Sequence, residues 1–304
     1  MENLNSRRNF LKLSATTALG ALVLSDFSLS AANAAPKSMG IGVQLYTIRD
    51  AMAKDVVGSL KKVADLGYKY LELASYSNGK FYGYEPVAFK KIVNDLGMQI
   101  ISSHTQVEAL GITIDNATKM AEDHAKLGVK YCIQPWVVEE ARKTLSSYKK
   151  MAADWNKVGK IMKEHKIQFG YHNHNFEFDT VEGKIPYYDV LLPELDKDLV
   201  TMELDLFWAT KAGQNPVEMF KKYPGRFQLF HMKDAQTKEA PFYQPATKDF
   251  APVGTGIINF KEILANREKA GLKYMFVEQD STQDGKPFDS IKTSITNLRT
   301  KLLL

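Results

Sequence analysis

The chain is poor in cysteine, with Cys132 as its only one among 304 residues. No intramolecular disulfide can form, so the stability of the fold has to come from a hydrophobic core. Long apolar runs are also lacking. The run over residues 13–24 falls short of the roughly 20 residues that a membrane-spanning helix needs, so we expect no stable membrane span.

A strong excess of one charge is likewise absent. The net charge is +5 for the whole chain and +4 without residues 1–34, which hold three basic and two acidic side chains. A net positive charge this small argues against nucleic acid as a partner. Linkers rich in Pro, Gly or Ser are absent from residue 40 onward, and we therefore expect one domain over residues 35–304.

The amino terminus has the pattern of an export signal. Arg7 and Arg8 precede the apolar run, and Ala32 with Ala34 supplies the small-x-small pattern of a signal peptidase site. We predict that residues 1–34 form a twin-arginine signal peptide and that the mature protein is periplasmic. An amphipathic amino-terminal helix is the alternative, which the paired arginines disfavour. The twin-arginine route carries folded proteins, often with a cofactor loaded, which suits a metal enzyme.

Short β-rich runs alternate with amphipathic helical patterns along the rest of the chain. Eight such repeats predict an α/β fold, a single (β/α)8 TIM barrel. The expected strands are 40–44, 68–73, 99–103, 130–134, 168–172, 200–205, 227–231 and 274–278. The expected helices are 56–66, 86–96, 117–127, 147–165, 186–192, 216–222, 260–270 and 291–303.

Each expected strand ends at a polar side chain that can bind a metal or a sugar. The carboxyl ends of barrel strands meet on one rim, where the active sites of this fold lie, so these side chains should face a common mouth. Four of the six histidines are among them, whereas the other two fall on helical segments. The strand-end residues are Gln44, Glu72, His104, Gln134, His172 with His174, Asp205, His231 with Lys233, and Glu278.

The histidines after the fifth expected strand are the strongest sign of a metal site. Strand alternation places His172 and His174 on one face. Together with Asp205, His231 and Glu278 they would give one rim both nitrogen and oxygen ligands. This mixture suits Mn²⁺, Co²⁺, Zn²⁺ or Fe²⁺ better than a soft metal, which would need thiolates.

Several alternatives stay open at this rim. A lone strand histidine is usually a satisfied core residue, although four together weaken that interpretation. Glu203 shares a face with Asp205, so it lies one layer deeper or replaces Asp205 as a ligand. The long segment 235–259 is expected to cover the site, and Gly254 and Gly256 within it would form turns or let backbone approach a ligand.

The order of these motifs resembles the xylose isomerase-like sugar isomerase/epimerase barrels. The similarity covers essentially the whole mature chain, and its motifs stand at successive strand ends. The segments that carry it are Gly42 to Asp50 (GVQLYTIRD), Gly67-Tyr68 with Glu72, His104, Tyr171 to His174 (YHNH), Asp205, His231 to Asp234 (HMKD), Gly254 to Gly256 (GTG) and Glu278.

The resemblance implies a divalent metal held by Glu, Asp, His and Glu from strands five to eight. By position the last three ligands are Asp205, His231 and Glu278. The first position departs from the pattern, because His172 stands where many members have glutamate, and Glu177 is close enough to be the alternative ligand. We expect Mn²⁺, with Co²⁺, Zn²⁺, Mg²⁺ or Fe²⁺ as alternatives.

The chemistry expected of such a site is removal of a carbon-bound proton beside a carbonyl. A metal that bridges the carbonyl and the adjacent hydroxyl stabilises the resulting enediolate. Glu278 and one of His172 or His174 are the candidate bases. Sugar hydroxyls or the sugar ring are expected to meet Gln44, Glu72, His104, Gln134, Lys233, and Trp208 or Trp136, unless these side chains only pack or cap a loop.

The first functional hypothesis is therefore a metal-dependent isomerase or epimerase of a sugar or keto-sugar. The second is a lyase or hydrolase that eliminates the aglycone of a 3-keto-glycoside, which shares the enediolate. A carbohydrate-binding protein without catalysis would not need Asp205, His231 and Glu278 together. An endonuclease gains little support from the charge. Export favours a glycoside over a sugar phosphate, and the sequence leaves the oligomeric state open.

Overall fold

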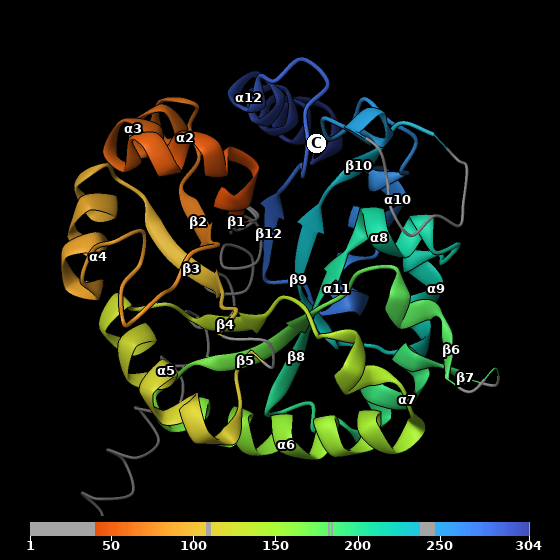
Figure 1. Ribbon diagram of the computed structural model, residues 1–304. Helices are drawn as coiled ribbons and strands as arrows, with labels where there is room; N and C mark the ends of the chain where they lie inside the picture. Colours follow the sequence, from red (N-terminus) through yellow and green to blue (C-terminus); the bar gives the residue numbers. More distant parts are fainter. Residues whose placement is uncertain (1–39, 108–110, 182, 184, 238–246, 304) are drawn as a thin grey trace, which may run out of the picture. The chain divides into compact units, whose positions relative to one another are not determined.

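A computed structural model describes residues 40–107, 111–181, 183, 185–237 and 247–303 (Figure 1). The predicted signal peptide, residues 1–34, lies outside these residues and remains a prediction. Within the described part of the chain, no helix has the length and apolar character that crossing a membrane would require.

Eight parallel strands close into a barrel, which confirms the predicted fold (Figure 1). Strand β1 closes it by pairing with both the second and the last barrel strand, Gly42 opposite Tyr70 and Gly40 opposite Tyr274. Around the chain the barrel strands are β1 (Gly40–Gln44), β2 (Tyr70–Leu73), β3 (Gln99–His104), β4 (Tyr131–Gln134), β5 (Gln168–His172), β8 (Val200–Asp205), β9 (Phe227–Met232) and β12 (Tyr274–Val277).

The strands are separated along the chain by amphipathic helices that bury one face. Two of these helices, α5 and α11, end at glycines with left-handed backbone, Gly128 at φ 87° and Gly271 at φ 85°, as their sequence positions predict. The helices are α3 (Val56–Asp65), α4 (Pro86–Asp95), α5 (Ile114–Leu127), α6 (Leu145–Glu164), α7 (Tyr187–Glu194), α9 (Pro216–Lys222), α10 (Phe260–Ala265), α11 (Arg267–Ala270) and α12 (Pro287–Asn297).

The structure differs from the sequence prediction mainly in the connections. The predicted helix 260–270 is two helices, because the chain turns at Asn266, whose N–H bonds to Ile263 O in a tighter pattern. Short elements also fill segments that the prediction left irregular. These are η1 (Leu45–Ile48), α2 (Arg49–Lys54), η2 (Glu139–Arg142), η3 (Phe176–Phe178), α8 (Leu206–Lys211), η4 (Thr247–Asp249), and the hairpins β6 (Thr180–Val181) with β7 (Ile185–Pro186) and β10 (Asp234–Ala235) with β11 (Phe250–Ala251). The predicted helix 291–303 ends in a separate element, η5 (Leu298–Leu302).

An apolar cluster is buried among the barrel strands. Phe276 belongs to it and lies beside His231, with 6.5 Å between the ring centroids. Room for the Phe276 ring depends on Gly42 of β1, where a Cβ atom would stand 2.5 Å from that ring. The buried cluster consists of Ile101, Tyr131, Ile133, Leu229 and Phe276.

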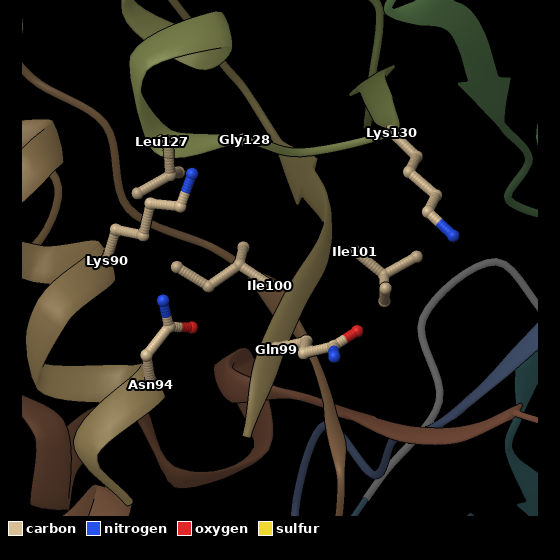
Figure 2. Close-up of a pocket in the computed structure, with 8 residues that line it drawn as sticks. All are labelled: Lys90, Asn94, Gln99, Ile100, Ile101, Leu127, Gly128 and Lys130. Atoms are coloured by element: carbon tan, nitrogen blue, oxygen red, sulfur yellow. The ribbon is translucent and has the colours of Figure 1, made fainter. Parts of the chain in front are cut away.

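A hollow of about 250 Å³ lies at the amino-terminal ends of β3 and β4. Figure 2 shows the residues that line it. Gln99, the first residue of β3, lies in its wall with Lys90 of α4 and Lys130. Among its lining residues there is no carboxylate and no imidazole. It opens at the amino-terminal end of the strands, opposite to the predicted site. In TIM barrels the residues at this end contribute to stability, whereas the active site lies at the other end.

Candidate functional site

A cleft of about 490 Å³ opens at the carboxyl-terminal ends of the barrel strands. This is the rim on which the sequence placed the site. The cleft contains five of the predicted strand-end residues, which come from strands β3, β5, β9 and β12 or the residues just after them. Those five are His104, His172, His174, Lys233 and Glu278.

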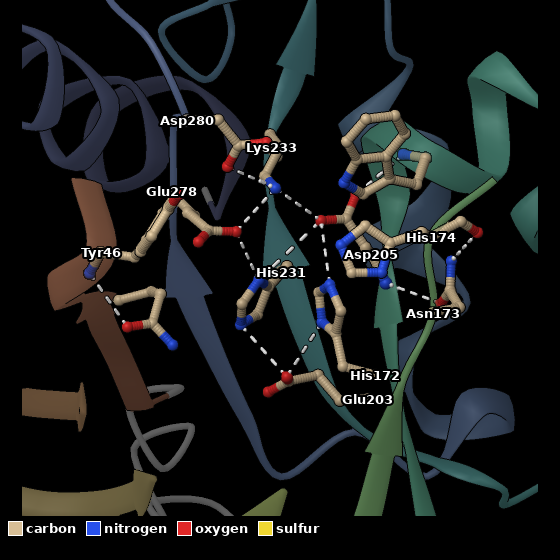
Figure 3. Close-up of polar contacts among 12 residues, drawn as sticks. Tyr46, His172, Asn173, His174, Glu203, Asp205, His231, Lys233, Glu278 and Asp280 are labelled. Atoms are coloured by element: carbon tan, nitrogen blue, oxygen red, sulfur yellow. Dashed lines mark hydrogen bonds and ion pairs between the residues drawn. The ribbon is translucent and has the colours of Figure 1, made fainter. Parts of the chain in front are cut away.

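Glu203 lies one layer deeper and contacts three of the predicted imidazoles, of which Figure 3 labels His172 and His231. Its Oε2 atom is 3.2 Å from His172 Nδ1 and 3.2 Å from His231 Nε2. A carboxylate accepts hydrogen bonds, so it favours the tautomers with a proton on these two nitrogens. The remaining nitrogens, His172 Nε2 and His231 Nδ1, lie on the side away from Glu203. His231 Nδ1 would offer its lone pair to a metal once it gives up its proton, because the surrounding carboxylates raise the pKa of His231.

His172 Nε2 and His231 Nδ1 lie close to two carboxylates at the rim. Asp205 Oδ2 is 3.8 Å from His172 Nε2 and 3.9 Å from His231 Nδ1, and Glu278 Oε2 is 2.8 Å from His231 Nδ1. Ligand atoms around a cation bonded at about 2.1 Å lie roughly 3–4 Å apart. Asp205, His231 and Glu278 are buried, and they form a rim group whose ligand atoms all lie within 4.8 Å of one another, which fits a divalent metal in both spacing and chemistry. His172 Nε2 adjoins this rim group at Asp205.

A second group of side chains could also hold a metal ion. It consists of His104, His172, Glu203 and His231, so it shares His231 with the rim group. Its His104 Nε2 lies 2.5 Å from Glu203 Oε2. That carboxylate oxygen stands among the three imidazole nitrogens and bonds to them directly, which makes the rim group the better fit.

Glu72 and Gln44 complete the inner network from strands β1 and β2. Glu72 Oε2 lies 2.5 Å from His231 Nε2 and accepts a hydrogen bond from Gln44 Nε2 at 2.9 Å. Both side chains are fully buried, and neither is among the residues that line the cleft. The structure thus brings Gln44 and Glu72 to the site, on the inner side of His231.

Lys233 is buried among three carboxylates above the rim group (Figure 3). Its Nζ atom is 2.7 Å from Glu278 Oε2, 3.0 Å from Asp205 Oδ2 and 2.9 Å from Asp280 Oδ1. Burial alone would lower the pKa of Lys233, but the three carboxylates outweigh it and raise that pKa well above its usual range. The ammonium and a bound metal would therefore share two carboxylates.

Asp280 is a site residue that the strand-end rule missed. Burial raises the pKa of Asp280 to about 6, and its side chain lines the cleft. A carboxyl group with a pKa in this range can give or accept a proton near neutral pH. Asp280 lies two residues after Glu278, and strand alternation continued past the last strand could have found it.

The imidazoles of the site differ in their charge. Burial, together with the neighbouring cations, lowers the pKa of His174 to about 3 and that of His172 well below its usual range. For His104 and His231 burial acts in the same direction, but the nearby carboxylates, Glu203 among them, outweigh it and raise the pKa. The site therefore combines neutral and protonated imidazoles.

The family model for the xylose isomerase-like TIM barrel matches residues 60–301. This chain belongs to that family. In this chain Asp205 ends strand β8, His231 belongs to β9, and Glu278 follows β12.

Similar proteins carry two kinds of names. A sugar phosphate isomerase/epimerase of Parabacteroides distasonis ATCC 8503 is 31% identical, with a TM-score of 0.74, over 86% of this chain and 98% of that one. An inosose dehydratase of Clostridium perfringens (strain 13 / Type A) is 28% identical over 44% of this chain and 48% of its own. The inosose dehydratase of Geobacillus kaustophilus (strain HTA426) is 23% identical over 68% of this chain and 73% of its own. The chain thus spans about half the length of the Clostridium relative.

Glu177, the alternative fifth-strand ligand of this xylose isomerase-like chain, points elsewhere. Its two oxygens accept hydrogen bonds from Tyr171 Oη at 2.5 Å and from His174 N at 2.8 Å. Glu177 belongs to neither group of possible metal ligands among the described residues. His172 instead lies beside the rim group, with its Nε2 at 3.8 Å from Asp205 Oδ2.

Besides Gln44 and Glu72, two more predicted sugar-binding residues, Gln134 and Trp208, do not line the cleft. The Gln134 side chain organises the loops after β3 and β4, since its Oε1 accepts from Ile112 N at 2.8 Å and its Nε2 donates to Trp136 O at 2.5 Å. Trp208 is buried, with its ring 5.7 Å from Lys233 Nζ. Trp136, in contrast, lines the cleft and is 40% exposed.

Asp234 joins the beginning of the predicted covering segment to its end through hydrogen bonds. Asp234 accepts hydrogen bonds from the backbone N–H groups of Ala235, Gly254, Gly256 and Ile258 at 2.8–3.2 Å. A Cβ atom at Gly256 would collide with Ala235 O. Both glycines therefore serve the turn, and residues 238–246 of the segment lie outside the described part.

Proposed function

We propose that this chain is a metal-dependent enzyme that removes the proton from the carbon beside the carbonyl of a sugar or keto-sugar, giving an enediolate. Isomerisation and epimerisation both proceed in this way. The observation that supports the proposal is the approach of four donor atoms, from His172, Asp205, His231 and Glu278, beside an open cleft.

These four residues would hold the metal, with Mn²⁺ as the first candidate and Co²⁺, Zn²⁺, Mg²⁺ or Fe²⁺ as alternatives. When bound, it would act as a Lewis acid that polarises the carbonyl. Glu203 would keep the two imidazoles in the ligating tautomers. Trp136, exposed in the wall of the cleft, offers a face for the sugar ring.

Of the two candidate histidines, His174 has the nitrogen that is better placed to accept a proton, although burial lowers its pKa to about 3 and makes it a weak base. Both nitrogens of His172 face carboxylates, whereas His174 Nδ1 has no hydrogen-bond partner among the described residues. Glu278, also in the cleft wall, remains a second candidate base. The Lys233 ammonium would favour the negative charge that develops on the substrate oxygens.

Elimination is the second candidate, as a lyase acting on a 3-keto-glycoside or a similar keto-sugar. It needs a group that protonates the leaving oxygen as well as a base. His104 lines the cleft with its Nε2 at 2.5 Å from Glu203, and the carboxylates raise its pKa, so it can carry that proton. The inosose dehydratase relatives, which are named for an elimination, support this candidate.

We also propose that the protein is exported by the twin-arginine route and acts in the periplasm. The paired arginines and the small-x-small pattern support this. Replacing Arg7 and Arg8 by lysine should leave the precursor in the cytoplasm. Fractionation that finds the variant exported as well as the native chain would contradict the proposal.

Metal content of the purified protein, followed by exchange in deuterated water, tests the proposed function. We expect about one bound metal per chain, lost in Asp205→Ala and in Glu278→Ala but kept in the control His165→Ala, which lies at the end of α6. Deuterium incorporation into keto-sugars with an intact skeleton would support isomerisation or epimerisation, and release of an aglycone would support elimination. Normal metal content in both rim variants would contradict the site.

A further inference from the structure

A second cleft of about 410 Å³ adjoins the catalytic cleft on the same rim. The two share Tyr46, Ala74 and Ser75 in their walls. One wall of this side cleft is the segment that follows β1, with η1 and α2. The other wall is the loop that follows β2.

The chemistry of the side cleft contrasts with that of the catalytic cleft. Ala53 and Val56 expose aliphatic surface in it, and the buried side chains of Leu45 and Met52 lie behind them. Its lining residues include no carboxylate and no imidazole, so it offers nothing for proton transfer or metal binding. Such a lining fits the apolar part of a ligand.

Its one charged lining residue, Arg49, already has bonding partners. Arg49 Nη1 donates to Tyr46 O and to Asp280 O, each at 3.0 Å, and its guanidinium carbon lies 4.2 Å from the centre of the Tyr46 ring. Arg49 thus joins the β1 segment to the loop that carries Asp280. It holds Tyr46 at the junction of the clefts, where this ring is 43% exposed.

The opposite wall is held in an unusual backbone conformation. Tyr82 has a φ of 50°, in the left-handed region that bulky residues rarely adopt. Its hydroxyl accepts a hydrogen bond from Ala74 N at 3.0 Å, and its ring stacks on Phe89 with 5.4 Å between centroids. Strain of this kind clusters at ligand-binding sites, where the surrounding contacts maintain it.

We propose that the side cleft binds an apolar or aromatic aglycone, so that the natural substrate is a glycoside whose sugar lies in the catalytic cleft. This inference rests on the proposed function and names its substrate class. The sugar would lie beside His174 and Glu278, and the glycosidic bond would pass Tyr46 at the junction of the two clefts. A free monosaccharide would leave the side cleft unused.

Binding of two glucosides that differ only in the aglycone tests the proposal. Phenyl β-D-glucopyranoside and methyl β-D-glucopyranoside lack the keto group, so calorimetry would measure binding without turnover. We expect the phenyl compound to bind about tenfold or more tightly, because a ring is buried. Ala53→Trp should fill the side cleft and reduce the difference to about twofold, with binding of the methyl compound unchanged.

Val87→Trp is the matched control, since Val87 is 66% exposed on α4 and lines neither cleft. It should keep the preference for the phenyl compound. Equal binding of the two glucosides, no binding of either, or tighter binding of glucose 6-phosphate would overturn the aglycone site. Deuterium exchange into keto-sugars would show separately whether the proposed function stands, because it does not depend on the side cleft.

Discussion

Glu203 supports His172 from beneath the cleft, with 3.2 Å between Oε2 and Nδ1. The contact fixes which imidazole nitrogen is free to meet Asp205 at the rim. Glu203 thereby acts through the ligand rather than on the metal or the substrate. Carboxylates placed in this way orient the ligand and raise its basicity.

Glu203→Gln should therefore weaken metal binding without removing a rim ligand. We expect a loss of about 10–100-fold in affinity, the usual effect of changing such a supporting residue. Titration of the metal-free protein with Mn²⁺ or Zn²⁺ would measure it. Glu218→Gln, at an exposed carboxylate paired with Lys221, is the control and should bind as the native protein does. Unchanged affinity in Glu203→Gln would contradict the supporting role.

Lys233 and a bound cation would compete for the same carboxylates, Asp205 and Glu278. Lys233→Met should leave these carboxylates without a counter-ion, which costs about 3–5 kcal/mol of stability in the metal-free protein. The same change should make metal binding about tenfold tighter or more, because no ammonium has to be shared. Thermal unfolding with and without metal would measure both effects.

Lys211→Met is the matched control for the loss of a buried ammonium. Lys211 is equally buried, but it bonds to Thr237 O and lies outside the rim group. It should lose stability without any gain in metal affinity. A Lys233→Met variant that binds metal more weakly than the native protein would show that the ammonium supports the metal.

The rim of the barrel was predictable because each strand ends where apolar alternation stops at a polar residue. Parallel strands bring such ends together, so His172, Asp205, His231 and Glu278 could be placed on one rim from the order of residues along the chain. Glu203 was open to the same reasoning, and the structure assigns it to the deeper layer.

The sequence could not decide where loop residues point. Glu177 and Gln134 have the chemistry of ligands, but their direction depends on turns of the backbone, and both bond to neighbouring loop atoms. The side cleft was also beyond prediction. It forms where the segments after β1 and β2 face each other, and Tyr46 gives no sign of this in the sequence alone.

Asp234 should be a main source of order in the turn that follows β9. Four backbone N–H groups donate to its carboxylate, and those of Ala235 and Ile258 belong to buried residues, so Asp234→Ala leaves buried donors without a partner. We expect a loss of about 3 kcal/mol or more in the free energy of unfolding, measured with denaturant. Asp234→Asn should lose less, and the exposed Asp65→Ala very little. A loss below about 1 kcal/mol in Asp234→Ala would contradict this role.

Glu177 should make the stability of the protein depend on pH. Burial raises the pKa of Glu177 to about 7, although Tyr171 and His174 donate hydrogen bonds to it. The folded protein therefore binds this proton more tightly than the unfolded chain. The stabilisation is fully present below the ordinary carboxyl pKa of about 4.3 and is lost as the pH rises through about 7.

Glu177→Gln imitates the protonated carboxyl at every pH and should remove this dependence. The variant should unfold at a higher temperature than the native protein above pH 7, and the difference should shrink steadily towards pH 5, because the native carboxyl then takes up its own proton. Melting temperatures of the native protein and of Glu177→Gln, measured between pH 5 and pH 8, would test this prediction. An advantage for the variant that is the same at pH 5 and pH 8 would assign the effect to packing instead of to the charge.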